Sequence, residues 1–430
     1  MIDIELIRSE PERVREAMRA KGLLPGGDAQ EDPVACARRL DKERREKITR
    51  LQEAQEERND RSGKIGELMR AGEEEKAQKH IARTKELKQQ IGSLEDEVDD
   101  ADDTLQRLLL DIPNLPHPSV PVGASEDDNA VEEETGEKPN FAFDPRPHWA
   151  LAERHDLVDF ERGSKVTGAG FPFYTGRGAR LQRALVQLFL DEAVEAGYRE
   201  MQPPLFVNED SARGTGQLPD KEDLMYEIGR DALFPIPTAE VPVTNFFRGD
   251  ILAAGDLPVK RCAYTPCFRR EAGSYGKDVR GLNRLHQFDK VELVWLTRPD
   301  ESYRALEQLR TDAERPLDLL GLPYRRLLMC TGDMGFAQAK KYDLEVWSAG
   351  QERWLEVSSV SNFESFQARR AQIRYREEPE ADPQLVHTLN GSALALPRVI
   401  AALLEHYQTE DGTVELPDVL SDYTGFERIG

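Results

Sequence analysis

The sequence predicts an α+β protein, in which an antiparallel sheet flanked by helices is preceded by a long antiparallel helical-hairpin (coiled-coil) arm. Two observations support this fold class. Apolar residues recur at heptad spacing in the N-terminal quarter of the chain, which is typical of a coiled coil. The remainder alternates short strand-like runs with loops and ends in an apolar helix, as an antiparallel α+β domain does.

Length and composition limit the class of protein. The 430 residues allow two or three domains, and 32% charged residues suit a chain with an extended polar part. The amino terminus lacks a signal-peptide pattern and no apolar run approaches the roughly 20 residues of a membrane helix, so we expect no membrane association. The four cysteines are too scattered for a disulfide framework, which favours a cytoplasmic location. Cys262 and Cys267 lack a second ligand pair, so no zinc is expected.

The first 112 residues are expected to form the arm. A short helix from Ser9 to Lys21, with Ser9 as N-cap, precedes one long helix from about Asp32 to Arg70 and another from about Glu73 to Asp111. A single break at 71–72 between helices of similar length favours an antiparallel hairpin, roughly 55 Å long at about 1.5 Å per residue. The heptad seam of the second long helix consists of Leu87, Ile91, Leu94, Val98, Ala101, Leu105, Leu108 and Ile112.

The charge of the arm has two interpretations. Residues 38–64 hold ten Lys/Arg and seven acidic residues, in a chain whose net charge is −23. A projecting cationic helix suits a nucleic-acid backbone, whereas charge-rich coiled-coil faces are usually only solvated. Composition alone leaves the two interpretations nearly even.

Residues 113–140 are rich in Pro, Gly and acidic residues and show no periodicity, so we interpret them as a linker. Their acidic run, Glu126 to Glu137, is expected to be a solvated loop. The domain that follows, 141–430, begins with an amphipathic helix from Ala179 to Glu195 and ends with one from about Leu396 to Tyr407.

A basic hairpin lies at the centre of this domain. From Lys260 to Arg284 the chain has seven Lys/Arg and two acidic residues, and strand-like runs flank a turn that contains Gly273, Gly276 and Gly281. A local positive charge in an acidic chain indicates a polyanionic ligand at this place. No Gly-rich phosphate-binding pattern occurs, so side chains would have to hold a nucleotide.

The hairpin sequence FRREAGSYGKDVRGLNRLHQFDKVE resembles motif 2 of class II aminoacyl-tRNA synthetases, in the form found in seryl-tRNA synthetases. GYREMQPPLFVNED is similar to motif 1 and NGSALALPRVIAALLEHYQ to motif 3, and PIPTAEVPVTN and the segment around LEVSS also match. Motif 3 departs from the common NGSGLAVGR at Ala393 and Pro397, although its arginine is present. The three motifs span about residues 179–208, 261–296 and 390–407.

The resemblance implies an ATP site built from side chains. Arg269 would contact the α-phosphate and the amino acid's carboxylate, and Arg284 would contact the γ-phosphate. Glu271 would accept a hydrogen bond from the adenine amino group, Phe288 would stack on the ring, and Arg398 would cover the other side of the nucleotide. The implied catalytic residues are Arg269, Arg398 and Glu356. The implied ATP-binding residues are Arg269, Arg270, Glu271, Arg284, Phe288, Glu356, Val357, Ser358, Ser359 and Arg398.

The resemblance also implies a magnesium site and a serine pocket. Glu356 and Ser359 would bind Mg²⁺ between the phosphates. Glu240 would neutralise the ammonium group of L-serine, and Glu292 would accept a hydrogen bond from its hydroxyl. The implied serine-binding residues are Thr238, Ala239, Glu240, Arg269, Glu292, Asn390 and Ser392. On sequence alone, Glu292 is equally well explained as a strand-end ion-pair residue.

The implied activity is ATP-dependent formation of seryl-adenylate, followed by transfer to the 3′ end of tRNA(Ser), with tRNA(Sec) a further acceptor. The tRNA would be bound by the N-terminal arm and the motif 2 loop, and motif 1 would form a homodimer interface, although ordinary core packing explains motif 1 equally well. We assign His286 a structural role. Two alternatives are a paralogue that loads an amino acid onto a carrier protein, and a tRNA-binding scaffold without catalysis. The intact arm argues against the first, and the presence of Arg269, Glu271, Glu356 and Arg398 argues against the second.

Overall fold

The computed structural model describes residues 1–24, 32–271 and 280–430. Its contacts divide the chain into two compact units. The arm unit comprises Ile2–Arg19 and Leu23–Pro113, and the sheet unit comprises Met1, Ala20–Gly22 and Asn114–Gly430. The predicted turn glycines Gly273 and Gly276 lie outside the described residues.

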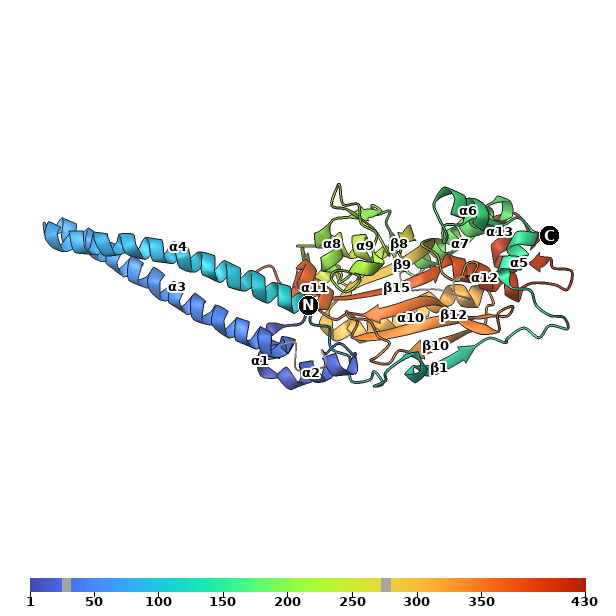
Figure 1. The fold of residues 1–430 in the computed structure, drawn as a ribbon, viewed down its shortest axis with the longest axis horizontal. Helices are drawn as coiled ribbons and strands as arrows, with labels where there is room; N and C mark the ends of the chain where they lie inside the picture. Colours follow the sequence, from blue (N-terminus) through green and yellow to red (C-terminus); the bar gives the residue numbers. More distant parts are fainter. Residues whose placement is uncertain (25–31, 272–279) are drawn as a thin grey trace. The chain divides into compact units, whose positions relative to one another are not determined.

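The arm is an antiparallel hairpin of two long helices, as predicted. Helices α3 (Pro33–Arg70) and α4 (Glu74–Leu110) lie side by side in Figure 1. The Asp32 carboxylate caps α3 by accepting a hydrogen bond of 2.9 Å from the Val34 N–H. Of the predicted seam, Leu87, Ile91 and Leu94 are buried in one apolar cluster. The hairpin therefore has its own narrow core between two charged faces.

The predicted helix from about Ser9 to Lys21 is confirmed, but Ser9 as its N-cap was wrong, and a further short helix precedes it. Two helices are present, α1 (Ile4–Ser9) and α2 (Pro11–Ala20). Ser9 ends α1, and its hydroxyl donates a hydrogen bond of 2.8 Å to the carbonyl of Glu5 within that helix. Helix α1 was missed because six residues are too few to show a helical period.

The sheet unit is built on a largely antiparallel sheet. Among the described residues this sheet has eight strands in the order β1-β10-β11-β12-β15-β9-β8-β4, and only β4 and β8 pair in parallel. In sequence order the strands are β1 (Ala130–Thr135), β4 (Arg199–Glu200), β8 (Val259–Phe268), β9 (Gln287–Thr297), β10 (Tyr324–Leu328), β11 (Lys340–Ser348), β12 (Arg353–Asn362) and β15 (His387–Ala395).

The predicted solvated loop in the 113–140 linker was also wrong. Residues 130–135 form the edge strand β1, which pairs with β10. The carboxylates of Glu132 and Glu133 make ion pairs with Arg326 at 3.1 and 2.8 Å. Charged side chains suit an edge strand, because they discourage pairing with another chain. The acidic composition that indicated a loop therefore belongs to a sheet edge.

Three helices cover one face of this sheet: α7 (Gly176–Glu195), α10 (Ser302–Leu319) and α12 (Leu396–His406). Figure 1 shows α10 and α12 against the central strands. Alternate residues of β9, namely Val291, Leu293 and Trp295, point into the large apolar core beneath these helices. The residues between them point to the opposite face, which leaves that face available for a site.

Smaller elements surround the sheet. The short helices are α5 (His148–Arg154), α6 (Phe160–Val166), α8 (Glu209–Gly214), α9 (Glu240–Asn245), α11 (Phe366–Ala371) and α13 (Ser421–Thr424). The short strands are β2 (Val158–Asp159), β3 (Phe173–Tyr174), β5 (Phe206–Val207), β6 (Phe234–Pro235), β7 (Ile251–Ala253), β13 (Arg374–Arg376), β14 (Gln384–Leu385), β16 (Val414–Glu415) and β17 (Arg428–Ile429). No helix in the described part of the chain has both the length and the apolar character needed to span a bilayer.

Truncation of the core under α10 should destabilise the sheet unit. Leu309 is fully buried, and the Cγ atom of its side chain lies 3.4 Å from where a Cβ on Gly391 of β15 would sit. We expect Leu309→Ala to lower the free energy of unfolding by about 2–5 kcal/mol, because it leaves a cavity. Urea denaturation followed by tryptophan fluorescence measures the change. The matched control, Val122→Ala at an 83% exposed position, should change it by less than about 0.5 kcal/mol; equal effects of the two variants would contradict this assignment of the core.

Candidate active site

A cavity of about 390 Å³ opens on the sheet face opposite α7, α10 and α12. This volume lies in the range of small-molecule sites. Residues from Gln217 to Arg398, far apart in the sequence, line it. The predicted site residues that line it are Thr238, Glu240, Arg269, Glu271, Arg284, Phe288, Glu292, Glu356, Val357, Ser358, Ser359, Asn390, Ser392 and Arg398.

One end of the cavity is a buried polar pocket on β9. The side chains of Lys290 and Glu292 point into it, and the Lys290 ammonium lies 2.5 Å from the Glu292 carboxylate. The Thr238 hydroxyl lies within hydrogen-bonding distance of both, at 3.0 Å from Lys290 and 3.1 Å from Glu292. Ser392 on β15 is in register with Glu292 and lines the same pocket. The pocket therefore presents several hydrogen-bonding groups at known positions to a small polar ligand.

A second carboxylate, Glu240, stands at the start of α9 in this pocket. It is buried, and it accepts a hydrogen bond of 2.6 Å from the Gln367 amide. Burial, followed by repulsion from Glu292, raises the pKa of Glu240 to about 7. A buried carboxylate of this kind is stabilised in its charged form by a cationic ligand, so the pocket suits an ammonium group.

The middle of the cavity is shaped by an irregularity in β12. Strand pairing with β11 shifts between Leu344 and Glu345, so Glu356 and Ser359 both line the cavity although three positions separate them. Regular alternation would place residues three apart on opposite faces. The Ser359 hydroxyl donates a hydrogen bond of 2.9 Å to the Glu356 carboxylate.

Two charged residues of β11 lie behind this pair. Asp343 is in register with Ser359, and its carboxylate lies 3.0 Å from the ammonium of Lys341. Burial disfavours the charge on Lys341, but attraction to Asp343 and Glu356 outweighs it and raises the pKa of Lys341. Burial raises the pKa of Asp343, whose Oδ1 atom has no hydrogen-bond partner. Asp343 therefore lies beneath the cavity wall, whereas Lys341 lines the cavity itself.

The arginines line the wider part of the cavity. The Arg269 guanidinium lies 5.1 Å from the centre of the Phe288 ring and donates a hydrogen bond of 3.3 Å to the carbonyl of Pro237. Arg284 pairs closely with Glu271 across the two strands of the hairpin. These cations come from β8, β9 and their flanks, so one hairpin positions much of the positive charge.

Arg398 enters the cavity from the first turn of α12. It donates hydrogen bonds to two backbone carbonyls, those of Asn283 at 2.9 Å and Glu356 at 2.6 Å. Pro397 lies in the first turn of the helix, where a proline needs no N–H donor, so the departure from the motif 3 pattern does not disrupt α12. Ala393, the other departure, is buried in the core.

Some predicted residues do not line the cavity. Ala239 is buried in a small apolar cluster, and the Arg270 side chain is not part of the cavity wall. Arg270 lies two residues beyond the end of β8, and its backbone N–H donates a hydrogen bond of 2.9 Å to the carbonyl of Leu224. His286 accepts or donates a hydrogen bond of 2.7 Å with the Tyr226 hydroxyl, outside the cavity wall. Cys262 is a buried free thiol within the core.

Sequence reasoning missed several cavity residues. Lys290 had a usable signal, because it precedes Glu292 by two positions and therefore shares its face of β9. Lys341 and Lys221 had no such signal, since nothing local in the sequence indicates that either turns inward. Burial, with repulsion from Arg269, lowers the pKa of Lys221. With Lys221, Lys290 and Lys341 in its wall, the cavity has more cationic side chains than the sequence indicated.

Fold and site together define a class. A largely antiparallel sheet has helices on one face and, on the other, an arginine-lined cavity without a Gly-rich phosphate loop, and this is the core of a class II aminoacyl-tRNA synthetase. The model of the tRNA synthetase class II core domain (G, H, P, S and T) matches residues 226–407. The model of the seryl-tRNA synthetase N-terminal domain matches residues 1–116.

Individual relatives specify the family further. The chain is 64% identical to a serine–tRNA ligase of Salinibacter ruber, over 100% of this chain and 99% of that protein. Its fold matches the seryl-tRNA synthetase of Pyrococcus horikoshii complexed with ATP, with a TM-score of 0.93, 37% identity and coverage of 100% and 99% of the two chains. A cytoplasmic serine–tRNA ligase of Naegleria fowleri in complex with AMP gives a TM-score of 0.84 and 27% identity, with coverage of 100% and 98%. This chain belongs to the seryl-tRNA synthetase family.

The raised pKa of Glu240 predicts a pH-dependent stability difference. Glu240 ionises near pH 7 in the folded protein, against an ordinary pKa of 4.5, so its stabilising effect is complete below pH 4.5 and is lost as the pH rises through 7. Glu240→Gln abolishes this loss while it retains an acceptor for Gln367. We therefore expect the variant, relative to the unsubstituted protein, to gain about 2 kcal/mol of unfolding free energy between pH 5 and pH 8 without ligands.

Urea denaturation at the two pH values measures this difference. Glu222→Gln, which removes an exposed carboxylate, controls for the loss of a carboxylate as such. A stability difference between Glu240→Gln and the unsubstituted protein that stays constant from pH 5 to pH 8 would contradict the effect of burial.

Proposed function

We propose that this chain is a serine–tRNA ligase, which uses ATP to activate L-serine and then transfers the seryl group to tRNA(Ser). One observation carries the proposal: a small pocket of buried hydroxyl-binding and ammonium-binding groups opens directly into a larger, arginine-lined cavity. Activation of an amino acid requires these two sites side by side, because the carboxylate of one substrate attacks the α-phosphorus of the other.

The wider part of the cavity is assigned to ATP. Arg269 and Arg398 provide positive charge toward the α-phosphate region, where negative charge increases as the carboxylate oxygen attacks and pyrophosphate leaves. Phe288 offers a ring face to adenine, and Glu271 and Arg284 are within the same wall. The Glu271–Arg284 pair separates when the nucleotide engages both groups. The assignment rests on the family motifs and on the shared cavity.

Magnesium fits the β12 part of the site. Within the described residues no three His, Cys, Asp or Glu side chains are grouped closely enough to hold a metal by themselves. Mg²⁺, however, is commonly held by one or two protein oxygens together with phosphates and water. The adjacent Glu356 carboxylate and Ser359 hydroxyl both line the cavity and provide such oxygens. Bound there, the ion would neutralise phosphate charge.

The pocket on β9 is assigned to serine. Glu240 neutralises the ammonium group, and Glu292 accepts a hydrogen bond from the substrate hydroxyl, with Asn390 and Ser392 in the same wall. When alanine enters instead, these buried groups remain unpaired, which gives a discrimination of roughly 10⁴ in favourable cases. Lys290 pairs with Glu292 and orients it together with Thr238.

The arm is assigned to tRNA, with tRNA(Sec) as a further acceptor. Its cationic residues Arg38, Arg50 and Lys64 are exposed, which suits contact with phosphates along a duplex. The motif 2 loop is assigned to the acceptor end, although residues 272–279 lie outside the described part of the chain. For motif 1 we propose a homodimer interface, because Val194 and Phe206 in this segment expose 49% and 48% of their surface. The four free cysteines favour the cytoplasm.

Pyrophosphate exchange with a panel of amino acids tests this function. We expect serine to support ATP–pyrophosphate exchange, with alanine lower by roughly 10⁴ in kcat/KM and with threonine and cysteine also discriminated against. Arg269→Ala should reduce serine-dependent exchange by about 10³-fold, because it removes a charge from the reacting centre. Arg304→Ala, at an exposed arginine of α10, is the matched control. Full activity of Arg269→Ala, or a preference for another amino acid, would refute the assignment.

Deletion of the arm separates the two steps of the reaction. A variant in which residues 31–111 are replaced by a short Gly/Ser linker should retain serine-dependent exchange, since the cavity is lined only by residues from 217 onward. Its charging of tRNA(Ser) should decrease by about 10²-fold or more, as expected when several phosphate contacts are lost. Aminoacylation with labelled serine measures this step. Undiminished charging by the deletion variant would instead favour a carrier-protein acceptor.

A further inference from the structure

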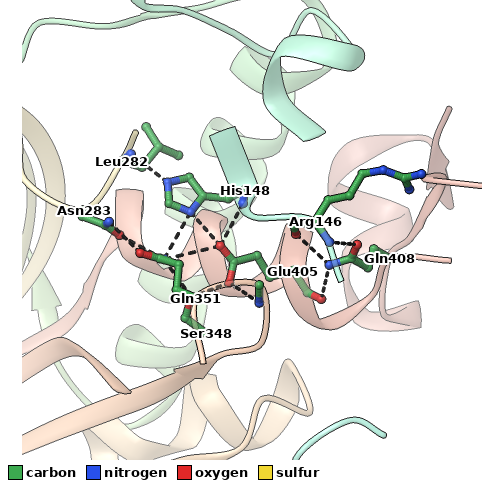
Figure 2. A network of polar contacts seen from close by, with 9 residues as sticks. Arg146, His148, Leu282, Asn283, Ser348, Gln351, Glu405 and Gln408 are labelled. Carbon is green, nitrogen blue, oxygen red and sulfur yellow. Dashed lines mark hydrogen bonds and ion pairs between the residues drawn. The ribbon is translucent and has the colours of Figure 1, made fainter. Parts of the chain in front are cut away.

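A buried polar network lies next to the proposed ATP site and is not explained by the motifs. Its centre is the Glu405 carboxylate on α12, which is completely buried together with His148 of α5. Figure 2 shows the network reaching from this carboxylate to Leu282 and Asn283, which line the cavity. Buried polar networks are costly unless every member is paired, so its extent calls for a physical reason.

Glu405 is held by donors from two separate segments. His148 donates to it from its backbone N–H and from its ring Nδ1, each at 2.8 Å. The Gly350 N–H donates at 3.0 Å, and the Ser348 hydroxyl also donates to the same carboxylate. These hydrogen bonds fix the orientation of the His148 ring against the carboxylate.

The other ring nitrogen of His148 holds the segment that returns from the motif 2 loop. The Leu282 N–H donates a hydrogen bond of 2.9 Å to Nε2. A backbone N–H only donates, so Nε2 is the acceptor and the ring proton is on Nδ1, where it faces Glu405. Gly281 has a φ of +69°, and a Cβ there would lie 2.3 Å from Nε2. The segment therefore needs a glycine in order to reach the histidine.

A parallel link runs through Gln351. Its side-chain amide donates to the Ser348 hydroxyl at 2.7 Å and accepts from the Asn283 side chain at 2.8 Å. The carbonyl of Asn283 then accepts the hydrogen bond of 2.9 Å from Nε of Arg398. Residues 282–283 are thus bound to α12 at two places, Glu405 through His148 and Arg398 directly, and Arg284 follows immediately.

We infer that His148, held by Glu405, is a positioning residue for ATP, which places the segment 282–284 so that Arg284 and Arg398 face the phosphates. The inference rests on the proposed function of this cavity. No corresponding hydrogen bonds connect His148 to the Thr238, Glu240 and Glu292 pocket. Loss of His148 should therefore weaken the binding of ATP and leave the binding of serine unchanged.

Two amide variants separate this role from a purely structural one. In His148→Asn the side-chain amide occupies the Nδ1 position and retains the donor to Glu405, but no acceptor remains for Leu282. In His148→Gln the side-chain carbonyl reaches the Nε2 position and retains that acceptor, but the Nδ1 donor to Glu405 is lost. We expect His148→Asn to raise KM for ATP about tenfold, the effect of one lost hydrogen bond in a buried site, while KM for serine changes less than about twofold.

The order of thermal stabilities should be the opposite. His148→Gln, which weakens the hold on a buried carboxylate, should melt at a lower temperature than His148→Asn and yet keep KM for ATP within about threefold of the unsubstituted protein. Gln408→Ala is the matched control, because Gln408 bonds Arg146 and the carbonyl of Glu405 in the same region but does not contact residues 282–284 (Figure 2). It should lower the melting temperature without changing KM for ATP.

The test measures serine-dependent ATP–pyrophosphate exchange by the full-length protein, together with the melting temperature of each variant. If His148→Asn is unfolded, Gly281→Ala breaks the same contact from the loop side and should raise KM for ATP alone. An unchanged KM for ATP in His148→Asn, or in Gly281→Ala where that variant replaces it, would overturn the inference. The inference would also fail if the variants with the lowest melting temperatures had the highest KM for ATP, or if Gln408→Ala raised KM for ATP. Absence of exchange in the unsubstituted protein would instead overturn the proposed function.

Discussion

The two faces of the central sheet have opposite chemistry, and the rest of the sheet unit depends on this division. On β9, Val291, Leu293 and Trp295 enter the apolar core, while Lys290 and Glu292 between them enter the cavity. The pleat enforces this alternation, so a strand that anchors the core necessarily presents its other residues to the ligand side. The core under α7, α10 and α12 therefore also positions the charged site.

Charges gathered in a cavity must be balanced, because a buried unpaired ion is costly. The pairs Lys290–Glu292, Lys341–Asp343 and Arg284–Glu271 provide this balance without ligands. Lys290, Glu292, Lys341, Arg284 and Glu271 all line the cavity in the absence of ligands. The site is thus organised in advance of the substrates, which reduces the reorganisation required in the reaction.

The fold and the larger part of the cavity lining could be predicted because they correspond to local patterns in the sequence. The heptad of α4 and the amphipathic pattern of α12 are periodic. Arg269, Glu356 and Arg398 lie within short sequence motifs that resemble those of the family, and all three line the cavity. Strand β1 could not be predicted, since its glutamates match a loop in composition and are explained only by Arg326 on a distant strand. Helix α1 was too short for a period to be visible. Long-range pairing, not local propensity, decides such elements.

The relation between Glu356 and Ser359 shows the same limit inside the site. Their spacing contradicts a shared face in a regular strand, and only the shift in pairing between β11 and β12 brings both to the cavity. His148 is the extreme case, since 134 positions separate it from Leu282 and 257 from Glu405. Arg398 and Glu405 lie two turns apart on α12 and are both bound to the segment at 282–283, directly or through His148. A helix bound to one segment at two points cannot rotate or slide without breaking one of these hydrogen bonds. The direction in which Arg398 enters the cavity is therefore determined in part by the distant contact of Glu405 with His148.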